Sequence, residues 1–463
     1  MKTHRLLTML MLCACASGYA QNKLWNFGGR CGLDFTSGSP VATTTSMMQA
    51  DEGCVTITNN ANQLLFYSNG DTVWNANNVP MPNGTGLNGQ LSSSQSCLAV
   101  RKPGSTTHWY LFTTAAQGNA AGLCYSEIDM SLNSGMGDVT SNKNVQLVTP
   151  CCEKLAAVRH ANGIDIWLVA HPLNSGSYLA YLVTASGIST PVNSLVGGTI
   201  FSSSNNDATI GCMKFSCAGN KLAVAQWGFG EIQLYDFNNA TGTVSNYQWL
   251  DIPYKPYGVE FSATGHYLYV ASEYNLTHYL FQYDVTVANV PGSEITIDTT
   301  GLGVNAVYGL QLGPDHKIYG ARLFDDSLAV INNPDVSGTG CGFVLNAVSL
   351  GGRISYYGLP NFLPAGYCIP SNPDAIAEES STDLISLYPN PAIDILHVAP
   401  SFGADGYQIT VRNSLGQVVY ESYYTRSQSI DIVTDCYQPG LYFLTVESEQ
   451  ITTVSPIVLT SAE

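Results

Sequence analysis

Three tyrosines and one glutamate directly precede glycines that recur at equivalent points of a repeated sequence pattern, and an aspartate precedes the glutamate. These residues are Asp51, Glu52, Tyr257, Tyr308 and Tyr357. Aromatic rings stack on sugars and peptides, and carboxylates accept hydrogen bonds from such ligands, so a converging set of these side chains predicts a binding site. The alternative interpretation is that the tyrosines pack inside the protein as core residues.

Motifs of common catalytic sites do not occur in this sequence. There is no Gly-x-Ser-x-Gly elbow, no His-Glu-x-x-His pair, no phosphate-binding loop and no dinucleotide fingerprint. His160 and His171 flank one predicted strand, which would hold them about 30 Å apart and too far to share a metal. We therefore assign no catalytic residue and expect no metal and no cofactor.

The tyrosines belong to a repeat that sets the architecture. Residues 256–285 contain three short runs rich in Val, Tyr, Phe and Leu, separated by two turns, and each run is a predicted strand. Similar patterns surround Phe215 and Leu312, at a spacing of about 50 residues, which is typical of β-propeller blades. The recurring glycine predicts a place where backbones crowd around the propeller axis.

Counting the first strand of each repeat predicts a seven-bladed β-propeller. Further first strands are expected at 52–57, 95–100 and 155–158, and a final one at 357–362. Because no strand follows the final one before the composition changes, we expect the N-terminal segments 24–28 and 32–35 to complete the last blade. Such closure would tie both ends of the domain and remove open sheet edges.

The beginning of the chain predicts export. Residues 1–20 combine positive charge, an apolar run at 6–16 and small residues at 18–20, which is the pattern of a signal peptide. No other apolar run approaches the roughly 18 residues of a membrane helix. We therefore expect no membrane span, and a location outside the cell or on its outer surface, reached through the periplasm.

Charge and cysteine content restrict the partners and the redox state. The formal net charge is −17, from 17 basic and 34 acidic residues, which argues against nucleic acid or an anionic membrane as partner. Of the thirteen cysteines, Cys13 and Cys15 lie in the predicted signal peptide, leaving eleven. Disulfides are permitted after export, but an odd number leaves at least one thiol unpaired or paired between chains.

The composition shifts after residue 366. We predict a propeller at 22–366, a linker poor in large apolar residues at 367–383, and a second domain at 384–463. Six or seven short predicted strands fall within the last of these ranges. That number of strands predicts a small Ig-like β-sandwich, so the whole protein is expected to be all-β.

The C-terminal region resembles the sorting domain of type IX secretion cargo, an export route of Bacteroidetes. The resemblance rests on Leu387, Tyr388, Pro389, Asn390 and Pro391, on the Asn-Ser-Leu-Gly-Gln run at 413–417, and on Gly440 and Tyr442 in a Pro-Gly-Leu-Tyr-Phe run. It implies an address tag read by the type IX translocon and sorting machinery, without chemistry on a substrate. One departure is Ser455-Pro456, where the family usually has a lysine. The alternative is an accessory β-sandwich.

The larger region resembles secreted propeller proteins of unknown function from the same bacteria. The similarity lies in LWNFGG at 24–29, DEGC at 51–54, DTVWN at 71–75 and the repeats. This resemblance implies the propeller fold and brings no activity with it.

The leading hypothesis is a secreted or cell-surface binding module for an extracellular glycan or protein, with its ligand at the mouth of the central channel. An extracellular hydrolase or lyase acting on polysaccharide is an alternative, and it would need two carboxylates about 5–9 Å apart in the channel. A structural surface-layer component is a third possibility.

Overall fold

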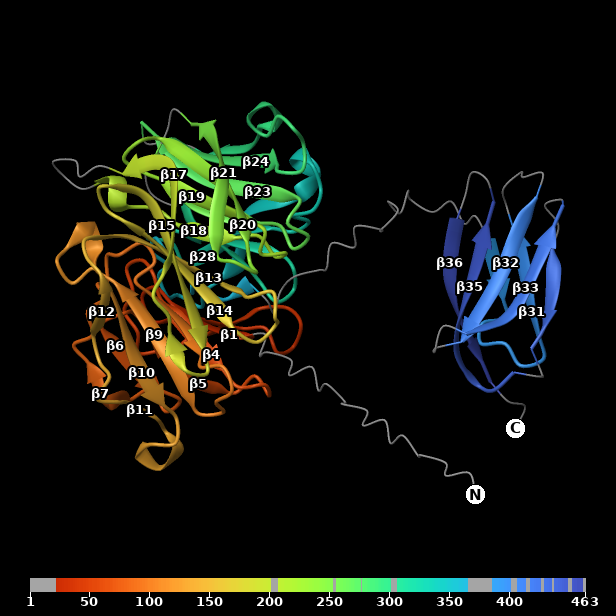
Figure 1. Ribbon diagram of the computed structural model, residues 1–463, viewed down its shortest axis with the longest axis horizontal. Helices are drawn as coiled ribbons and strands as arrows, with labels where there is room; N and C mark the ends of the chain where they lie inside the picture. Colours follow the sequence, from red (N-terminus) through yellow and green to blue (C-terminus); the bar gives the residue numbers. More distant parts are fainter. Residues whose placement is uncertain are drawn as a thin grey trace, which may run out of the picture. The chain divides into compact units, whose positions relative to one another are not determined.

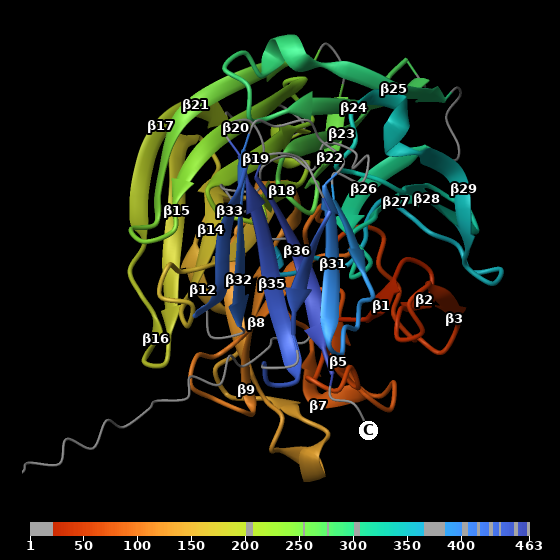
Figure 2. The same cartoon turned by 90° about the vertical axis from the view of Figure 1, so that its right-hand side faces the viewer.

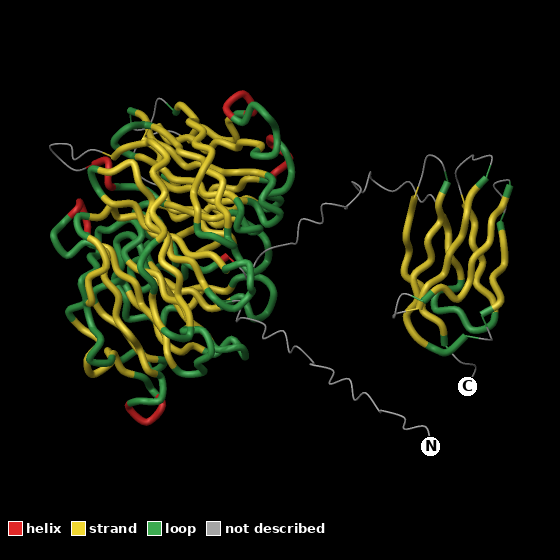
Figure 3. Tube along the Cα trace, viewed as in Figure 1, coloured by secondary structure: helices red, strands yellow, loops and turns green. Residues whose placement is uncertain are grey.

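The computed structural model describes residues 22–200, 207–252, 255–275, 277–300, 306–364, 385–400, 406–413, 417–425, 429–434, 437–448 and 452–460. The predicted signal peptide and linker lie outside these residues. The chain divides into two compact units, Met1–Ser371 and Asn372–Glu463. Strands dominate both units (Figure 3), and none of the described helices is long and apolar enough to cross a membrane.

The first unit consists of antiparallel sheets in which strands that follow one another along the chain pair with one another (Figure 1). The sheet nearest the N-terminus contains β1 (Leu24–Phe27), β2 (Cys31–Asp34) and β3 (Val41–Thr43). The next contains β4 (Val55–Thr58), β5 (Leu64–Ser68), β6 (Thr72–Asn75) and β7 (Pro80–Thr85). It is followed by β8 (Cys97–Arg101), β9 (His108–Thr114), β10 (Leu123–Asp129), β11 (Asp138–Val139) and β12 (Val145–Val148).

Four more sheets follow in chain order. The first contains β13 (Cys151–Arg159), β14 (Ile166–Pro172), β15 (Ser175–Thr184), β16 (Gly187–Ile188) and β17 (Val192–Ile200), and the second contains β18 (Met213–Phe215), β19 (Lys221–Gln226), β20 (Glu231–Asn238) and β21 (Thr243–Asp251). The third contains β22 (Lys255–Phe261), β23 (Tyr267–Tyr274), β24 (Thr277–Asp284) and β25 (Ile295–Thr300). The fourth contains β26 (Val307–Leu312), β27 (Ile318–Arg322), β28 (Ser327–Ile331) and β29 (Phe343–Ser349). Described 3-10 helices are η1 (Ala116–Gly118), η2 (Asn133–Gly135), η3 (Asp207–Thr209), η4 (Pro291–Ser293) and η5 (Gly338–Cys341).

The sheets of the first unit follow one another in chain order (Figure 2). Apolar clusters lie between successive sheets. One cluster joins β19 and β20 to β22 and β23 through Ile232, Val259 and Val270. Another joins the β26–β29 sheet to β1 and β2, where the rings of Trp25 and Tyr319 are 5.5 Å apart. Because this cluster also contains Tyr67 of β5, the order of packing returns to the β4–β7 sheet and the sheets form a closed ring. This all-β arrangement is propeller-like, as predicted.

Recurring glycines allow the first strands of neighbouring sheets to approach closely. A Cβ on Gly258 would lie 2.0 Å from the backbone oxygen of Tyr308, and one on Gly358 would lie 2.2 Å from that of Glu52. Direct backbone hydrogen bonds accompany this crowding, including Gly309 N to Tyr357 O at 2.8 Å. The glycines therefore mark the contacts between first strands, in agreement with the expectation from the sequence.

Two features of the sheets differ from the sequence prediction. The repeats were expected to hold three strands, but outer strands such as β21, β25 and β29 add a fourth. Every side chain of β29 is partly or fully exposed, although its sequence, FVLNAVS, is largely apolar. Residues 357–362 form no ladder; a single parallel bridge joins Pro360 to Cys54, and Asn361 N donates to Cys54 O at 2.8 Å.

The second unit contains two antiparallel sheets. One has the order β30 (Ile385–Tyr388), β31 (Ile395–Pro400) and β34 (Ile430–Val433), and the other has the order β33 (Val418–Tyr424), β32 (Tyr407–Asn413), β35 (Gly440–Glu447) and β36 (Thr452–Leu459). Alternate residues of these strands point inward, where Leu396, Tyr407 and Leu444 are fully buried in one apolar cluster. This period of two is what a half-buried strand requires.

Cysteines in the described residues are mostly buried free thiols. They are Cys31, Cys54, Cys97, Cys124, Cys151, Cys152, Cys212 and Cys341. Cys217 is disulfide-bonded. Burial raises the pKa of the Cys31 thiol to about 12, so it stays protonated and packs as a small apolar side chain.

Candidate functional site

The predicted tyrosines and Glu52 meet at one end of the first strands. Tyr257 lies in β22 and Tyr308 in β26, while Glu52 precedes β4. The Tyr257 hydroxyl donates to Glu52 Oε2 at 2.7 Å. The ring centroid of Tyr308 is 4.7 Å from that of Tyr357 and 5.7 Å from that of Tyr257. Four of the five predicted residues are therefore in one cluster.

Asp51 does not join this cluster through its side chain. Its Oδ1 accepts a hydrogen bond from Gln49 Nε2 at 3.3 Å. Its backbone oxygen accepts one from Tyr357 N at 3.0 Å. Asp51 thus positions the segment that carries Tyr357.

Trp227 completes the cluster, and sequence reasoning missed it. The residue lies in the turn between β19 and β20, with its ring centroid 6.2 Å from Tyr257 and 6.4 Å from Tyr308. Lys255 Nζ lies 5.2 Å from the Trp227 ring centroid, a cation–π geometry. Glu52, Trp227, Tyr257, Tyr308 and Tyr357 are called the mouth cluster below. The signal that could have revealed Trp227 was a large aromatic residue in a Gly-rich turn.

Two further polar residues support Tyr308 from the neighbouring sheet. Its hydroxyl donates to Glu273 Oε2 at 2.8 Å, and the His278 ring lies 5.2 Å from its ring. Glu273 and His278 are directly opposite one another on β23 and β24. His278 is 4% exposed, and neither ring nitrogen has a hydrogen-bond partner in the described part of the chain. Burial lowers the pKa of His278, which favours the neutral imidazole.

Most of the mouth cluster is covered by protein. Tyr257 is 2% exposed and Tyr308 is 5% exposed, so both rings pack as core residues do. Tyr357 and Trp227 are partly exposed. A ligand at this end would therefore meet the edges of the cluster and the turns around it.

Those turns present exposed aromatic side chains at or after the ends of the second strands of three successive sheets. Phe229 follows β19, Tyr274 ends β23 and Phe324 follows β27, and they are 47%, 49% and 58% exposed. The strand register places each turn beside the start of a first strand; Lys255 of β22, for example, is opposite Glu273 of β23. The exposed aromatics and the mouth cluster therefore lie at the same end of the first unit.

Phe324 has an unusual backbone conformation. Its φ is +59°, a left-handed conformation that is unusual for a bulky residue and costs about 1–3 kcal/mol. The neighbouring segment maintains this conformation, because Phe324 N donates to Ser355 O at 3.0 Å and its ring lies edge-on to Tyr356. Residues held in such strained conformations cluster at binding sites.

The carboxyl group of Glu52 has an unusual protonation state. Burial raises its pKa from the ordinary 4.5 to about 8, and the nearby negative charge of Glu153 adds to the increase. Hydrogen bonds from Tyr257, Ser92 and Ser94 act in the opposite direction. Glu52 is therefore mostly neutral at pH 7 in the folded protein.

This pKa predicts that stability decreases with rising pH. Between about pH 4.5 and 8 the folded state keeps the Glu52 proton while the unfolded state has lost it. The contribution of Glu52 to the free energy of unfolding is therefore fully present below pH 4.5 and is lost as the pH rises through 8. Replacing Glu52 with glutamine should flatten this dependence in urea unfolding measured at pH 5, 7 and 9. Ser92→Ala, which removes a bond to Glu52 Oε1, should steepen it. Equal slopes in all three proteins would contradict the assignment.

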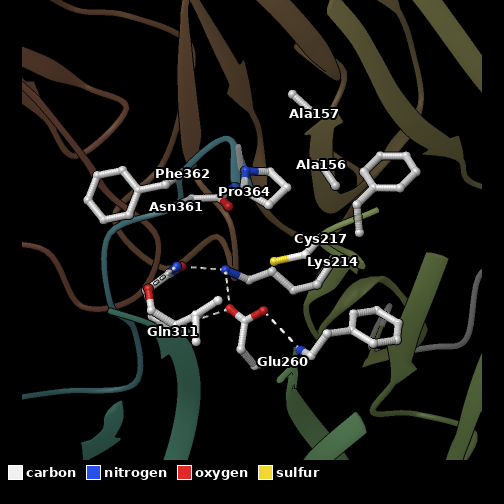
Figure 4. Close-up of a pocket in the computed structure, with 12 residues that line it drawn as sticks. Ala156, Ala157, Lys214, Cys217, Glu260, Gln311, Asn361, Phe362 and Pro364 are labelled. Carbon is white, nitrogen blue, oxygen red and sulfur yellow. Dashed lines mark hydrogen bonds and ion pairs between the residues drawn. The ribbon is translucent and has the colours of Figure 1, made fainter. Parts of the chain in front are cut away.

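Behind the mouth cluster, polar side chains fill the channel. Figure 4 shows Lys214 between Glu260 and Gln311, with Lys214 Nζ 3.3 Å from Glu260 Oε2. Gln95 spans two strands by accepting from Met213 N at 2.8 Å and from Leu155 N at 3.2 Å. Two cavities lined by described residues here have volumes of about 20 Å³ each, room for one water each. Ligand contacts are therefore expected at the mouth.

In the second unit, the residues of the predicted sorting motif link β30 to β36. Leu387 packs against the apolar cluster while Tyr388 is exposed. Pro389 and Pro391 are exposed in the turn, and Asn390 Oδ1 accepts from Val458 N at 2.8 Å. Gly440 begins β35, and the Tyr442 hydroxyl donates to Gln438 O at 2.8 Å. The motif therefore contributes to the fold of this unit.

Solved structures similar to this chain share little sequence with it. They include a protein from Lactobacillus plantarum (13% identity, TM-score 0.39, covering 82% of this chain and 98% of that one). The periplasmic gluconolactonase of Pseudomonas aeruginosa has 13% identity and a TM-score of 0.38, covering 80% and 94%. The hydrazine synthase of Kuenenia stuttgartiensis has 12% identity and a TM-score of 0.43, covering 69% and 98%. At these identities no activity is transferred.

No curated protein matches the chain. Residues 386–460 match the family described as the secretion system C-terminal sorting domain. The matched range covers β31 to β36 and nearly all of β30. Through these residues the chain is identified as type IX secretion cargo, which the sorting machinery delivers to the cell surface or the extracellular space.

Proposed function

We propose that this protein is a seven-bladed β-propeller with an Ig-like C-terminal sandwich, and that it binds an extracellular glycan or protein at the mouth of the propeller. In this proposal the seven sheets of the first unit are the blades, with β1–β3 and residues 357–362 forming the last. The domain ranges remain 22–366, 367–383 and 384–463, with residues 1–20 as signal peptide. The sorting domain supplies the export route.

The observation that carries the binding proposal is the exposed aromatic set above the mouth cluster. Phe229, Tyr274 and Phe324 expose large apolar surface on three neighbouring turns, and one of them occupies a strained backbone conformation. Exposed aromatic groups are costly in water and are typical of binding surfaces. Glu273 and Lys255 lie beside them and can bond to polar groups of a ligand.

The carboxylates at this end favour binding over bond cleavage. A hydrolase needs two carboxyl groups that reach the substrate. Glu153 contributes to the raised pKa of Glu52, but it is 1% exposed and accepts hydrogen bonds from Ser94 N, Ser94 Oγ and Gln117 N. The two carboxyl oxygens of Glu52 accept hydrogen bonds from the hydroxyl groups of Tyr257 and Ser92.

Binding can be tested with a variant that leaves the buried core intact. In Phe229→Ala/Tyr274→Ala/Phe324→Ala, the three exposed rings are removed, and we expect binding to glycan and peptide arrays to fall at least tenfold, since each stacked ring contributes about 0.5–1.5 kcal/mol. Tyr308→Phe, which removes only the bond to Glu273, should have a smaller effect.

The matched control is Ile164→Ala/Leu195→Ala/Val344→Ala. It removes three other exposed apolar side chains, which are 61%, 80% and 45% exposed, at positions outside the three turns. This variant should bind as the unmodified protein does. Equal loss in both triple variants, or no loss in either, would contradict a ligand site at the mouth.

A further inference from the structure

A larger cavity lies at the opposite end of the first strands, between the β4–β7 sheet and the β8–β11 sheet. Its volume is about 330 Å³, and Thr58 and Arg101, the last residues of β4 and β8, line it. Ligand pockets have volumes of about 300–1,000 Å³. The mouth cluster lies at the start of the first strands, so this cavity is separate from it.

The strand register brings a cation and an indole together on the wall of this cavity. Arg101 of β8 and Trp109 of β9 are directly opposite one another, so their side chains share one face of the sheet. The Trp109 ring contacts Phe66 of β5 edge-on, with centroids 5.8 Å apart. Arg101 and Trp109 therefore face the β4–β7 sheet.

Arg101 has hydrogen-bond donors available for a ligand. Its Nε donates to Ser105 O at 2.7 Å, while its terminal nitrogens have no partner among the described residues. None of the residues lining the cavity is acidic, although the chain has twice as many acidic as basic residues, 34 against 17. A positive wall in so acidic a protein favours an anionic ligand.

The rest of the lining suits a ligand rich in hydroxyl groups. Asn60 and Thr106 are exposed at the cavity, and Leu65 adds an apolar patch. Turns and strand ends border the cavity, because Thr106 lies between β8 and β9 and Arg101 ends β8. It therefore offers no strand edge for main-chain pairing with a peptide.

We propose that this cavity binds a sugar residue carrying an acid group, as found in acidic polysaccharides. The Arg101 guanidinium pairs with the acid group through two parallel hydrogen bonds. The Trp109 indole covers the apolar face of the sugar ring, and Asn60 and Thr106 bond to its hydroxyl groups. This site would be a second ligand site, separate from the proposed site at the mouth cluster, and neither proposal depends on the other.

Calorimetric titration of the full exported chain tests the proposal with three probes: trigalacturonate, a sulfated galactose trisaccharide and neutral maltotriose. The unmodified protein should bind at least one acidic probe and bind maltotriose at least tenfold more weakly. The probe that binds decides whether the acid group is a carboxylate or a sulfate. Added NaCl should weaken binding, because the pair is partly exposed.

Three variants complete the test. Arg101→Ala should weaken binding at least tenfold, and Arg101→Lys should weaken it less because the charge remains while the two-pronged geometry is lost. Arg412→Ala removes an exposed arginine of the second unit and should change nothing. Unaltered binding by Arg101→Ala with native circular dichroism, equal binding of maltotriose, or no binding of any probe would overturn the proposal.

Discussion

Replacing Glu260 with alanine is expected to lower the free energy of unfolding of the first unit by about 3–5 kcal/mol, because it leaves a buried positive charge unpaired. Lys214 and Glu260 are 8% and 5% exposed, and Nζ lies 3.3 Å from Oε2. Glu260 also accepts from Leu312 N at 3.1 Å and from Phe261 N at 3.0 Å. One carboxylate therefore connects β18, β22 and β26.

Tryptophan fluorescence during urea unfolding measures this loss in the first unit alone. All six tryptophans lie in that unit, at positions 25, 74, 109, 167, 227 and 249. The matched control is Asp236→Ala, which breaks the Lys221–Asp236 pair at 2.6 Å, whose side chains are 25% and 36% exposed. Exposed pairs contribute only about 0–1 kcal/mol.

A double variant distinguishes the loss of the ion pair from the cost of leaving one buried charge unpaired. Lys214→Met/Glu260→Leu removes both charges and should lose less stability than Glu260→Ala, because no uncompensated charge remains. Equal losses for Glu260→Ala and Asp236→Ala would show that the pair at the channel contributes no more than an exposed one. That outcome would contradict its role as a link between the three strands.

Gly258→Ala should destabilise the first unit by about 3 kcal/mol or more, since the added methyl group enters space already occupied by backbone. The new Cβ would lie 2.0 Å from Tyr308 O and 3.1 Å from Leu310 N. Unlike a flexible side chain, these atoms cannot rotate away, so β22 and β26 must separate. The separation would also move Tyr257 away from Tyr308, so binding at the mouth should fall together with stability.

Gly163→Ala is the control for this substitution. Gly163 has a φ of +72° and no neighbouring atom within 4 Å of the added Cβ, so its replacement costs only the left-handed conformation, about 1 kcal/mol. The same fluorescence measurement compares the two variants. A smaller loss for Gly258→Ala than for Gly163→Ala would contradict the close approach of the first strands.

The first strands and their glycines could be predicted from sequence because their cause is local. Val, Tyr and Leu runs mark buried strands, and Gly258 or Gly309 marks a position that excludes a side chain. Outer strands such as β21 were missed, since exposed strands contain polar residues that do not differ from turns. The buried pair Lys214–Glu260 was missed for the opposite reason: charged residues on a strand indicate a solvated face until the sheets are placed.

The candidate site also combines features with a local cause in the sequence and features that depend on how the sheets are placed. Tyr257, Tyr308 and Tyr357 could be placed together because equivalent positions of a repeat meet at one axis. Their partners Glu273 and His278 come from second and third strands, whose registers no local pattern specifies. The Arg101 cavity requires two sheets to pack against each other, so a single repeat contains no trace of it.

The closure of the ring, in which the last sheet packs against the first, affects the order of folding. The contact of Cys31 Sγ with Ile354 O spans 323 positions of the chain. Contacts so distant in sequence form late, because a long loop must close before any energy is gained. The ring of the first unit therefore cannot close until residue 354 has been synthesised, so nearly all of that unit exists before its first and last sheets can pack together.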